Sequence, residues 1–351
     1  MTILNLVESL RFARTDDGVS IGYQMFGQGP VLVWMPSLSN IVAQWRIPWL
    51  RTAYETLARS LTVILYDGRG TGSSDRDIDL GDLGVDAHLR DLRAVLAHAG
   101  VERASLFGYY HSVATAIAFA ARSPATVERL VLFGGAPRMR EAMQPAQTKA
   151  LLSLVDQDWG LFADAAATAW LGWDAAPSSK WTAEAFRTAT TAATARAWFD
   201  AAATIDVSDE LSSVRAPALI VHRQGEQQIP AAVFRRLVAS LPDARLVERP
   251  GSTPTLFMED AATDLTLVTG FVKSGRIDAT PSGTRSLTPR ERQVLDRLAD
   301  GDSNTEIARK LGIAVHTVER HLGNLYRKIG ARGRTDAVVY ALRMTENPHT
   351  G

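Results

Sequence analysis

The segment from Leu106 to Ser112, Leu-Phe-Gly-Tyr-Tyr-His-Ser, contains the side chains best spaced for covalent chemistry. A hydroxyl-bearing residue between a glycine and a small residue is the arrangement that exposes a nucleophile on a tight strand-to-helix turn, ready to attack an acyl carbon. Here Gly108 and Ser112 frame the turn, and Tyr110 supplies the hydroxyl. A phenol has an unperturbed pKa of about 10 and is roughly 0.1% ionised at neutral pH, so it is a poor nucleophile for acyl transfer.

The residues around this turn predict alternating strands and helices. Short β-rich runs lie at residues 30–35, 61–66, 104–107, 129–133, 218–222 and 244–247, and helical patterns between them include residues 86–99 and 113–121. Strands separated by helices indicate a mostly parallel sheet. We therefore expect an α/β fold in which Tyr110 directly follows a strand.

A long insertion interrupts the alternation at residues 139–210. It is rich in alanine and contains Trp159, Trp170, Trp173, Trp181 and Trp198. We interpret it as a helical cap over the sheet. Each tryptophan alone fits a filled helical core, but the five together favour an aromatic-lined cavity.

Across residues 11 to about 272 the chain resembles the α/β-hydrolase fold family. The segment from Tyr66 to Ser74 is similar to the family's D-x-R-G-x-G-x-S turn, and the turn at Tyr110 is similar to its nucleophile elbow. The segment from Ser123 to Leu132 is similar to the helix, turn and strand that follow the elbow. The resemblance implies a large domain at residues 1–273 with the α/β-hydrolase fold and a cap at about residues 139–210.

The resemblance also implies positions for a catalytic triad, and two of these positions carry the wrong side chain. Tyr110 stands at the serine position, whereas Glu226 occupies the acid position. Pro254 stands where the general-base histidine belongs, and no histidine lies between His222 and His316. Without an imidazole, the family's route can neither deprotonate a nucleophile nor protonate a leaving group.

The segment Trp34-Met35-Pro36-Ser37 stands where the family commonly has His-Gly and forms part of its oxyanion hole. Bulky side chains and a proline reduce the number of free backbone N–H donors there. The nucleophile position, the general-base position and the oxyanion hole are thus all altered. We therefore expect a pseudo-hydrolase that has no enzymatic activity, no catalytic residue, no metal and no cofactor.

A second register would make Ser112 the nucleophile, with His111 before it. This register lengthens the preceding strand by two residues and breaks the similarity downstream, and His111 is too close along the chain to serve Ser112 as a base. In that case, or with an unconventional base, the chain would be bifunctional and also hydrolyse an ester or lactone.

An inert sheet with an intact pocket suits a receptor, so we predict that the large domain binds a small, largely apolar effector. Tyr110 would donate a hydrogen bond to the ligand rather than attack it. The alternative is a filled core without a ligand. The residues predicted to line the site are Trp34, Met35, Ser37, Tyr109, Tyr110, His111, Trp159, Trp170, Trp173, His222 and Phe257.

The chain changes character after residues 274–286, a stretch rich in Gly, Ser, Thr and Pro that we interpret as a linker. Residues 284–345 carry 12 Lys/Arg against 7 Asp/Glu, although the whole chain has a net charge of zero. From Leu287 to about residue 345 the sequence closely resembles the LuxR-type helix-turn-helix domain. Thr288 with Glu291 and Ser303 with Glu306 have the spacing of capping boxes that begin helices.

A third helix in this domain carries Val318, Leu322, Leu325 and Ile329 on one buried face, which leaves the opposite face for the DNA major groove. We expect Glu319 and Arg320 to read bases. Ala314 replaces the serine that usually caps this helix, at a cost of about 1 kcal/mol. The remaining predicted DNA contacts, mainly to phosphates, are Ser303, Asn304, Thr305, Arg309, His316, Thr317, Asn324, Arg327 and Lys328.

The last helix, residues 336–343, has an apolar patch at Val338, Val339, Ala341 and Leu342. In the resembling family this helix mediates dimerisation, so we expect a homodimer on double-stranded DNA. The chain has no cysteine, and its first residues lack the basic start and apolar core of a secretion signal, so we expect a cytoplasmic protein. The sequence thus predicts a ligand-responsive transcriptional regulator; a constitutive regulator whose large domain only dimerises is the remaining alternative.

Overall fold

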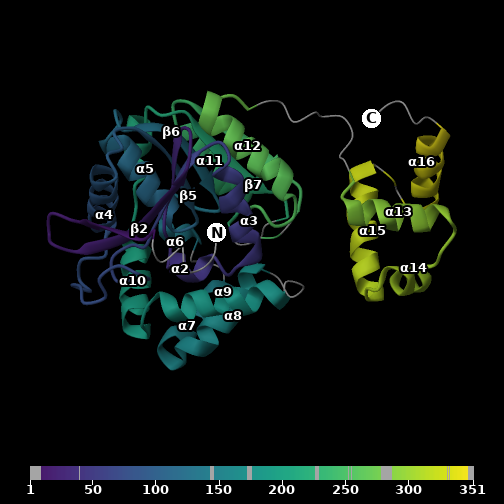
Figure 1. The fold of residues 1–351 in the computed structure, drawn as a ribbon, viewed down its shortest axis with the longest axis horizontal. Coiled ribbons are helices and arrows are strands. Elements are labelled where there is room, and N and C mark those ends of the chain that lie inside the picture. Colours follow the sequence, from purple (N-terminus) through teal and green to yellow (C-terminus); the bar gives the residue numbers. More distant parts are fainter. Residues whose placement is uncertain are drawn as a thin grey trace. The chain divides into compact units, whose positions relative to one another are not determined.

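The computed structural model describes residues 9–38, 40–142, 146–171, 176–225, 229–251, 253, 255–277, 287–329, 331 and 333–346. The chain forms two compact units, residues 1–278 and residues 279–351, whose elements are drawn in Figure 1. The boundary falls inside the predicted linker at residues 274–286, of which residues 278–286 lie outside the described part.

An eight-stranded sheet forms the centre of the first unit, in the order β1-β2-β4-β3-β5-β6-β7-β8. Pairing is parallel from β4 through β8, whereas β2 runs antiparallel to both β1 and β4. The mostly parallel sheet predicted from the sequence is confirmed, and β1 and β2 extend it. The strands are β1 (Arg11–Arg14), β2 (Ser20–Gly27), β3 (Val31–Trp34), β4 (Thr62–Tyr66), β5 (Ala104–Tyr109), β6 (Val127–Phe133), β7 (Ala218–Arg223) and β8 (Ala244–Arg249).

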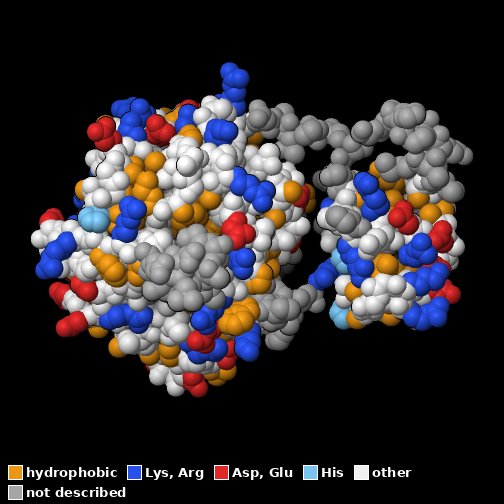
Figure 2. Space-filling model, in the orientation of Figure 1, with side chains coloured by type: hydrophobic (Ala, Val, Ile, Leu, Met, Phe, Trp, Pro, Cys, Tyr) orange, Lys and Arg blue, Asp and Glu red, His pale blue; other side chains and the backbone are white. Residues whose placement is uncertain are grey.

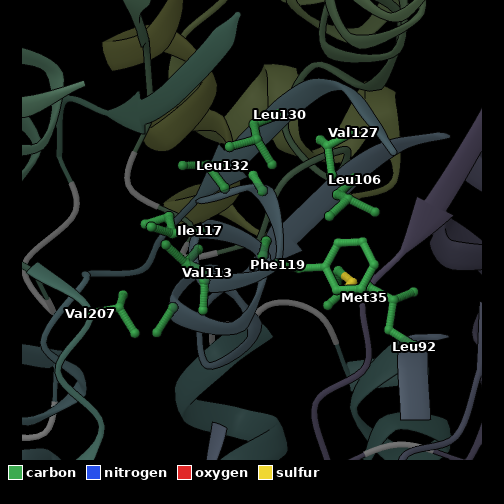
Figure 3. Close-up of a cluster of buried hydrophobic side chains, with 14 of the residues drawn as sticks. Met35, Leu92, Leu106, Val113, Ile117, Phe119, Val127, Leu130, Leu132 and Val207 are labelled. Atoms are coloured by element: carbon green, nitrogen blue, oxygen red, sulfur yellow. The ribbon is translucent and has the colours of Figure 1, made fainter. Parts of the chain in front are cut away.

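Helices cover both faces of this sheet, as parallel strands with continuous apolar runs require. On one face α4 (Val85–His98), α5 (Ser112–Arg122) and α11 (Ala231–Ser240) contribute to a core that includes Leu106 and Leu132, part of which is shown in Figure 3. On the opposite face α3 (Pro48–Leu57) and α12 (Ala261–Ser274) pack against Phe107, Val131 and their neighbours. Successive residues of one strand therefore alternate between two separate cores.

The insertion between β6 and β7 is helical, as its composition predicts. It contains α6 (Met139–Ala142), α7 (Ala146–Gln157), α8 (Trp159–Leu171), α9 (Ala176–Ala189), α10 (Ala192–Thr204) and the 3-10 helix η1 (Ser208–Ser213). A core of its own joins α7, α8 and α10 through Val155, Phe162, Trp198 and Phe199. A separate short helix, α2 (Ile41–Gln44), contacts α9. The cap therefore packs partly against itself and partly against the segment after β3.

The second unit consists of α13 (Pro289–Ala299), α14 (Asn304–Leu311), α15 (Val315–Ile329) and α16 (Arg334–Glu346) around one small core. Thr288 and Ser303 each form a complete capping box with the glutamate three residues later, so both predicted helix starts are confirmed. Val318, Leu322 and Leu325 are buried on one side of α15, as their spacing predicts. On the opposite side of α15, His316, Glu319 and Arg320 are exposed.

Candidate functional site

The backbone at Tyr110 has the strained geometry of a nucleophile elbow. Tyr110 lies between β5 and α5 with φ of 49°, a positive value that is uncommon for a residue other than glycine. Its N–H donates to the carbonyl of Phe133 at 2.9 Å, and its carbonyl accepts from the N–H of Val113 at 3.1 Å. The sharp turn of the fold is therefore made at Tyr110.

The ring of Tyr110 is accommodated because a glycine lies beside it. Gly134 has φ of 66°, and a Cβ atom placed on it would come within 2.7 Å of Cε2 and Cζ of the tyrosine ring. Tyr109 packs edge-on against the same ring with centroids 5.0 Å apart, and Phe133 does so at 6.0 Å. The ring of Tyr110 is therefore packed against the rings of Tyr109 and Phe133.

Ser112 is turned into the elbow and does not occupy the nucleophile position. Its Oγ accepts from the N–H of Tyr109 at 2.9 Å and donates to the carbonyl of Tyr109 at 3.0 Å, and the residue is only 4% exposed. This geometry argues against the alternative register with Ser112 as the nucleophile, because the strained φ belongs to Tyr110 and the serine hydroxyl hydrogen-bonds the local backbone.

The segment after β3 offers few backbone donors where the hydrolase fold forms its oxyanion hole. The N–H of Met35 donates to the carbonyl of Phe107 at 3.0 Å, which continues the sheet ladder. Pro36 has no N–H to donate. A developing oxyanion would therefore obtain no stabilisation from these two positions.

The predicted acid and base positions, Glu226 and Pro254, lie outside the described residues. At the ends of β7 and β8, Arg223 and Arg249 form a buried ion-pair network with Asp264. Arg223 donates through Nη2 to Oδ2 of Asp264 at 2.7 Å, and Arg249 donates through Nε to Oδ1 of the same carboxylate at 2.8 Å. This network is a structural one, because both oxygens of the buried Asp264 are engaged by guanidinium groups.

His111 is the imidazole nearest the elbow. Burial lowers its pKa to about 4, so the ring is neutral at pH 7. Its Nδ1 lies 3.5 Å from Oγ of Ser37, and its ring packs edge-on against Trp198 with centroids 4.8 Å apart. The histidine thus joins the elbow to the segment after β3 and to the cap.

A cavity lies in front of the elbow, bounded by the ends of β3, β4 and β5, by α2 and α3, and by α9 of the cap. The cavity has a volume of about 120 Å³. A dry apolar cavity of roughly 150 Å³ binds benzene, so this space is on the scale of one aromatic ring. The lining residues are Trp34, Met35, Pro36, Ser37, Leu38, Gln44, Ile47, Trp49, Leu50, Tyr54, Leu65, Tyr66, Tyr109, Tyr110, His111, Thr182, Ala185, Phe186 and Thr255.

Six of the predicted ligand-binding residues come together in this lining: Trp34, Met35, Ser37, Tyr109, Tyr110 and His111. Three others lie elsewhere. Trp159 stacks on Phe162 in the core of the cap, His222 stacks on Phe234, and Phe257 packs behind Trp34 with centroids 5.7 Å apart. The side chains of Trp170 and Trp173 lie outside the described part of the chain.

Other lining residues had no signal in the sequence. Gln44, Trp49 and Tyr54 come from α2 and α3, and Thr182 and Phe186 come from α9. Neither segment carries a motif. The packing of α9 against α2 helps to bring these segments to the same cavity.

In the second unit, the face of α15 opposite its buried stripe is charged and accessible. His316, Glu319 and Arg320 are exposed, as is Arg309 on α14. Figure 2 shows lysine and arginine side chains over this unit with acidic ones among them. Of the other predicted DNA contacts, Ser303 and Thr305 are exposed, Asn304, Thr317 and Asn324 are partly buried, and the side chain of Arg327 lies outside the described set.

Lys328 has an internal partner, which argues against its predicted role at a phosphate. Its Nζ donates to Oε2 of Glu291 at 2.6 Å, and Glu291 is only 3% exposed. The same carboxylate oxygen accepts from the N–H of Thr288 at 2.8 Å in the capping box. The lysine therefore neutralises a buried carboxylate and fastens α15 to the start of α13.

The apolar residues of α16 are partly used within their own unit. Ala341 is buried and Val338 packs against the core around Val318 and Leu325. The side chains of Val339 and Leu342, also predicted for a dimer contact, are outside the described residues. Ala341 therefore belongs to the small core, and the dimer contact of α16 stays a prediction.

The described residues contain neither a cluster of metal-ligating side chains nor a helix that could span a membrane. In this part of the chain no three histidine or carboxylate side chains gather into a possible metal site. No helix in the same part of the chain combines the length and apolar character needed to cross a membrane.

Comparison with known families agrees with both units. Residues 30–261 match the family model described as alpha/beta hydrolase fold, and the chain belongs to this family. Residues 285–341 match the model for bacterial regulatory proteins of the luxR family. The chain therefore joins an α/β-hydrolase fold to a luxR-type helical domain.

Similar curated proteins align with the second unit alone. The CsgBAC operon transcriptional regulatory protein of Escherichia coli is 51% identical over 55 residues, which is 16% of this chain and 26% of that protein. The probable transcriptional regulatory protein SgaR of Hyphomicrobium methylovorum is 45% identical over 64 residues, which is 18% of this chain and 30% of that protein. The chain thus spans between a quarter and a third of the length of these relatives.

Similar solved structures align with the first unit. An esterase from Exiguobacterium antarcticum has a TM-score of 0.65 at 19% identity, covering 75% of this chain and 99% of the esterase. The enol-lactonase from Burkholderia xenovorans LB400 has a TM-score of 0.60 at 22% identity, covering 75% of this chain and 99% of the lactonase. At this level of identity the likeness supports the fold and carries no activity.

Proposed function

We propose that the protein is a transcriptional regulator whose hydrolase-fold domain binds a small, largely apolar effector and whose luxR-type domain binds promoter DNA as a dimer. The observation that carries the proposal is the cavity in front of Tyr110. The fold keeps its elbow and a cavity before it, but the residue at the turn is a tyrosine whose ring is packed against its neighbours. A site of this kind holds a ligand without attacking it.

The absence of catalysis is part of the proposal. A phenol at the elbow is protonated at neutral pH, and neither Met35 nor Pro36 offers a backbone donor for an oxyanion. His111 is neutral and, with a pKa of about 4, a weak base. These features argue for ligand binding through apolar contact and hydrogen bonds.

Exposed side chains on α15 support a DNA interface. We propose that Arg320 and Glu319 read bases, while His316 and Arg309 contact phosphates. Lys328 is withdrawn from this set because it is bound to Glu291. A single domain of this size makes few base contacts, so specific binding is expected from a dimer on an inverted repeat.

The test of the DNA interface is selection of preferred sites from random duplex DNA by the full-length protein, followed by anisotropy titrations. Arg320→Ala should erase the sequence preference and leave salt-sensitive binding. The matched control is Arg297→Ala on α13, where the arginine is paired to Asp300 at 3.1 Å; it should retain full preference. An unchanged preference in Arg320→Ala would remove α15 as the reading helix.

One observation favours a second function. Oγ of Ser37 lies 3.5 Å from Nδ1 of His111 at the wall of the cavity, which is a serine–histidine pair in a hydrolase fold. Slow ester hydrolysis by this pair is the alternative to pure binding. It predicts that Ser37→Ala abolishes measurable turnover of p-nitrophenyl acetate, whereas the regulator proposal predicts no turnover above buffer in either protein.

A further inference from the structure

One aliphatic side chain of the second unit lies outside its core. Every valine, leucine and isoleucine side chain described in this unit is part of the core or packs against it, with the exception of Val315. Val315 is the first residue of α15, one turn before Glu319, and it is 38% exposed. Packing within the unit therefore does not explain a valine at this position.

Val315 shares an exposed row on α15 with Glu319 and Gly323. Residues four apart are neighbours on the surface of an α-helix, and all three of these residues are exposed. Glu319, which we propose as a base reader, stands in the middle of the row. A recognition helix presents its amino-terminal turns to the base edges, so a row that begins at Val315 is placed to meet them.

The third member of this row has no side chain, although the unit leaves room for one. A Cβ atom added to Gly323 would meet nothing within 4 Å among the described residues. Glycine in the interior of a helix is destabilising relative to alanine. A close approach by another molecule is a common reason to keep a glycine, because any side chain would block it. The position thus favours a partner that comes close to this row.

The major groove offers one apolar group to such a row, the C5-methyl group of thymine. Phosphates are contacted by cations and hydrogen-bond donors, and a valine side chain is neither. Contact between Val315 and a thymine methyl group would remove apolar surface of both from water, which is favourable. Thymine is therefore the base that fits an exposed valine at the start of α15.

The spacing of the row places this thymine relative to the base read by Glu319. Four residues of an α-helix rise by about 6 Å, whereas neighbouring base pairs are about 3.4 Å apart. A carboxylate accepts a hydrogen bond from N4 of cytosine. The thymine should thus lie one or two base pairs from a cytosine in the same half-site.

We infer that Val315 reads the methyl group of a thymine one or two base pairs from the cytosine bound by Glu319, and that Gly323 allows the DNA to approach α15 closely. The inference rests on the proposed function, since it adds a base and two residues to the same DNA interface. It makes Val315 a specificity-determining residue.

The test uses the full-length protein and the site that it selects from random duplex DNA. Each thymine of one half-site is replaced in turn by deoxyuridine, which lacks only the C5-methyl group, and anisotropy titrations give the affinity. One replacement, one or two base pairs from the preferred cytosine, should weaken binding by about 4-fold, the value of one buried methyl group.

Val315→Ser removes the apolar group from the protein side. It should weaken binding of the thymine duplex by about 4-fold and bind the thymine and deoxyuridine duplexes equally. The denaturation midpoint of the unit should not change, because Val315 lies outside the core. Leu161→Ser on α8 is the matched control: Leu161 is 52% exposed and lies in the first unit, so this variant should discriminate the two duplexes as the wild type does.

Gly323→Ala tests the close approach of the DNA. The substitution should raise the denaturation midpoint of the unit, because alanine favours the helix. It should also weaken DNA binding by about 5-fold or more, because the added methyl group crowds the interface. A variant that is more stable and binds DNA as tightly as the wild type would overturn the role of Gly323.

The outcomes separate this inference from the proposed function. A selected half-site without a thymine within two base pairs of a preferred cytosine would overturn the role of Val315. Wild-type binding that is indifferent to every deoxyuridine, or discrimination that survives in Val315→Ser, would overturn it as well. In each case, loss of sequence preference in Arg320→Ala would leave the proposed DNA interface standing, whereas a preference retained in Arg320→Ala would remove α15 as the reading helix.

Discussion

Replacing Gly134 by alanine tests whether the ring of Tyr110 is seated as the structure shows. The new Cβ would lie 2.7 Å from two ring atoms of Tyr110, too close for any real contact. Gly134 also has a positive φ of 66°, which costs an alanine about 1–2 kcal/mol. Crowding in a packed site adds about 1–3 kcal/mol, so the variant should lose about 2–5 kcal/mol of unfolding free energy.

Two further variants separate these contributions. Gly100→Ala is the matched control, because Gly100 has φ of 67° and a Cβ atom added to it would meet nothing within 4 Å, so only the backbone cost applies. In a Tyr110→Ser background the crowding disappears, so Gly134→Ala should cost about 1–3 kcal/mol less than it does in the wild type.

Denaturant unfolding followed by tryptophan fluorescence is the assay. All eight tryptophans lie at or before residue 198, so the signal reports the hydrolase-fold unit alone. A cost for Gly134→Ala equal to that for Gly100→Ala would refute the seating of the Tyr110 ring. Failure of Tyr110→Ser to relieve the cost would refute it as well.

Two other predictions concern charged and titratable groups. Lys328→Ala leaves the carboxylate of Glu291 buried without its cation, so it should lower the unfolding free energy of the luxR-type unit by about 1–3 kcal/mol. The control Arg297→Ala breaks an exposed ion pair and should cost less than about 1 kcal/mol. Unfolding followed by circular dichroism measures both costs, and equal costs would contradict the assigned role of Lys328. The pKa of His111 falls from 6.5 in the unfolded chain to about 4 in the folded protein. Between these two values the unfolded chain binds a proton that the folded protein does not, so the free energy of unfolding falls as the pH drops from 6.5 toward 4. His111→Gln should therefore flatten the loss of stability over this window by about 1–3 kcal/mol, and parallel pH profiles would contradict the shift.

The sheet and the elbow were predictable because local rules determine them. Continuous apolar runs such as residues 62–66 form buried strands, and Gly70 and Gly72 after Asp67 mark a turn that few other residues can make. The position of the elbow followed from the same logic. Its strained φ at Tyr110 agrees with the register chosen from the sequence.

The lining of the cavity was only half predictable, because it depends on how distant helices pack. Trp159 looked like a ligand contact but fills the cap through Phe162, whereas Trp49 reaches the cavity from a helix without any motif. From its position in the sequence of α15, Lys328 was predicted to contact a DNA phosphate. Its partner Glu291 is brought beside it by the capping box of another helix.

The most direct test of the central claim, a cavity that binds without catalysing, follows one neutral ester, phenyl acetate, through binding and hydrolysis on the same sample. We predict saturable binding that Ala185→Trp abolishes by filling the cavity, and release of phenol no faster than in buffer. Release of phenol faster than in buffer, lost in Ser37→Ala, would contradict the claim, because the cavity would then be a catalytic site.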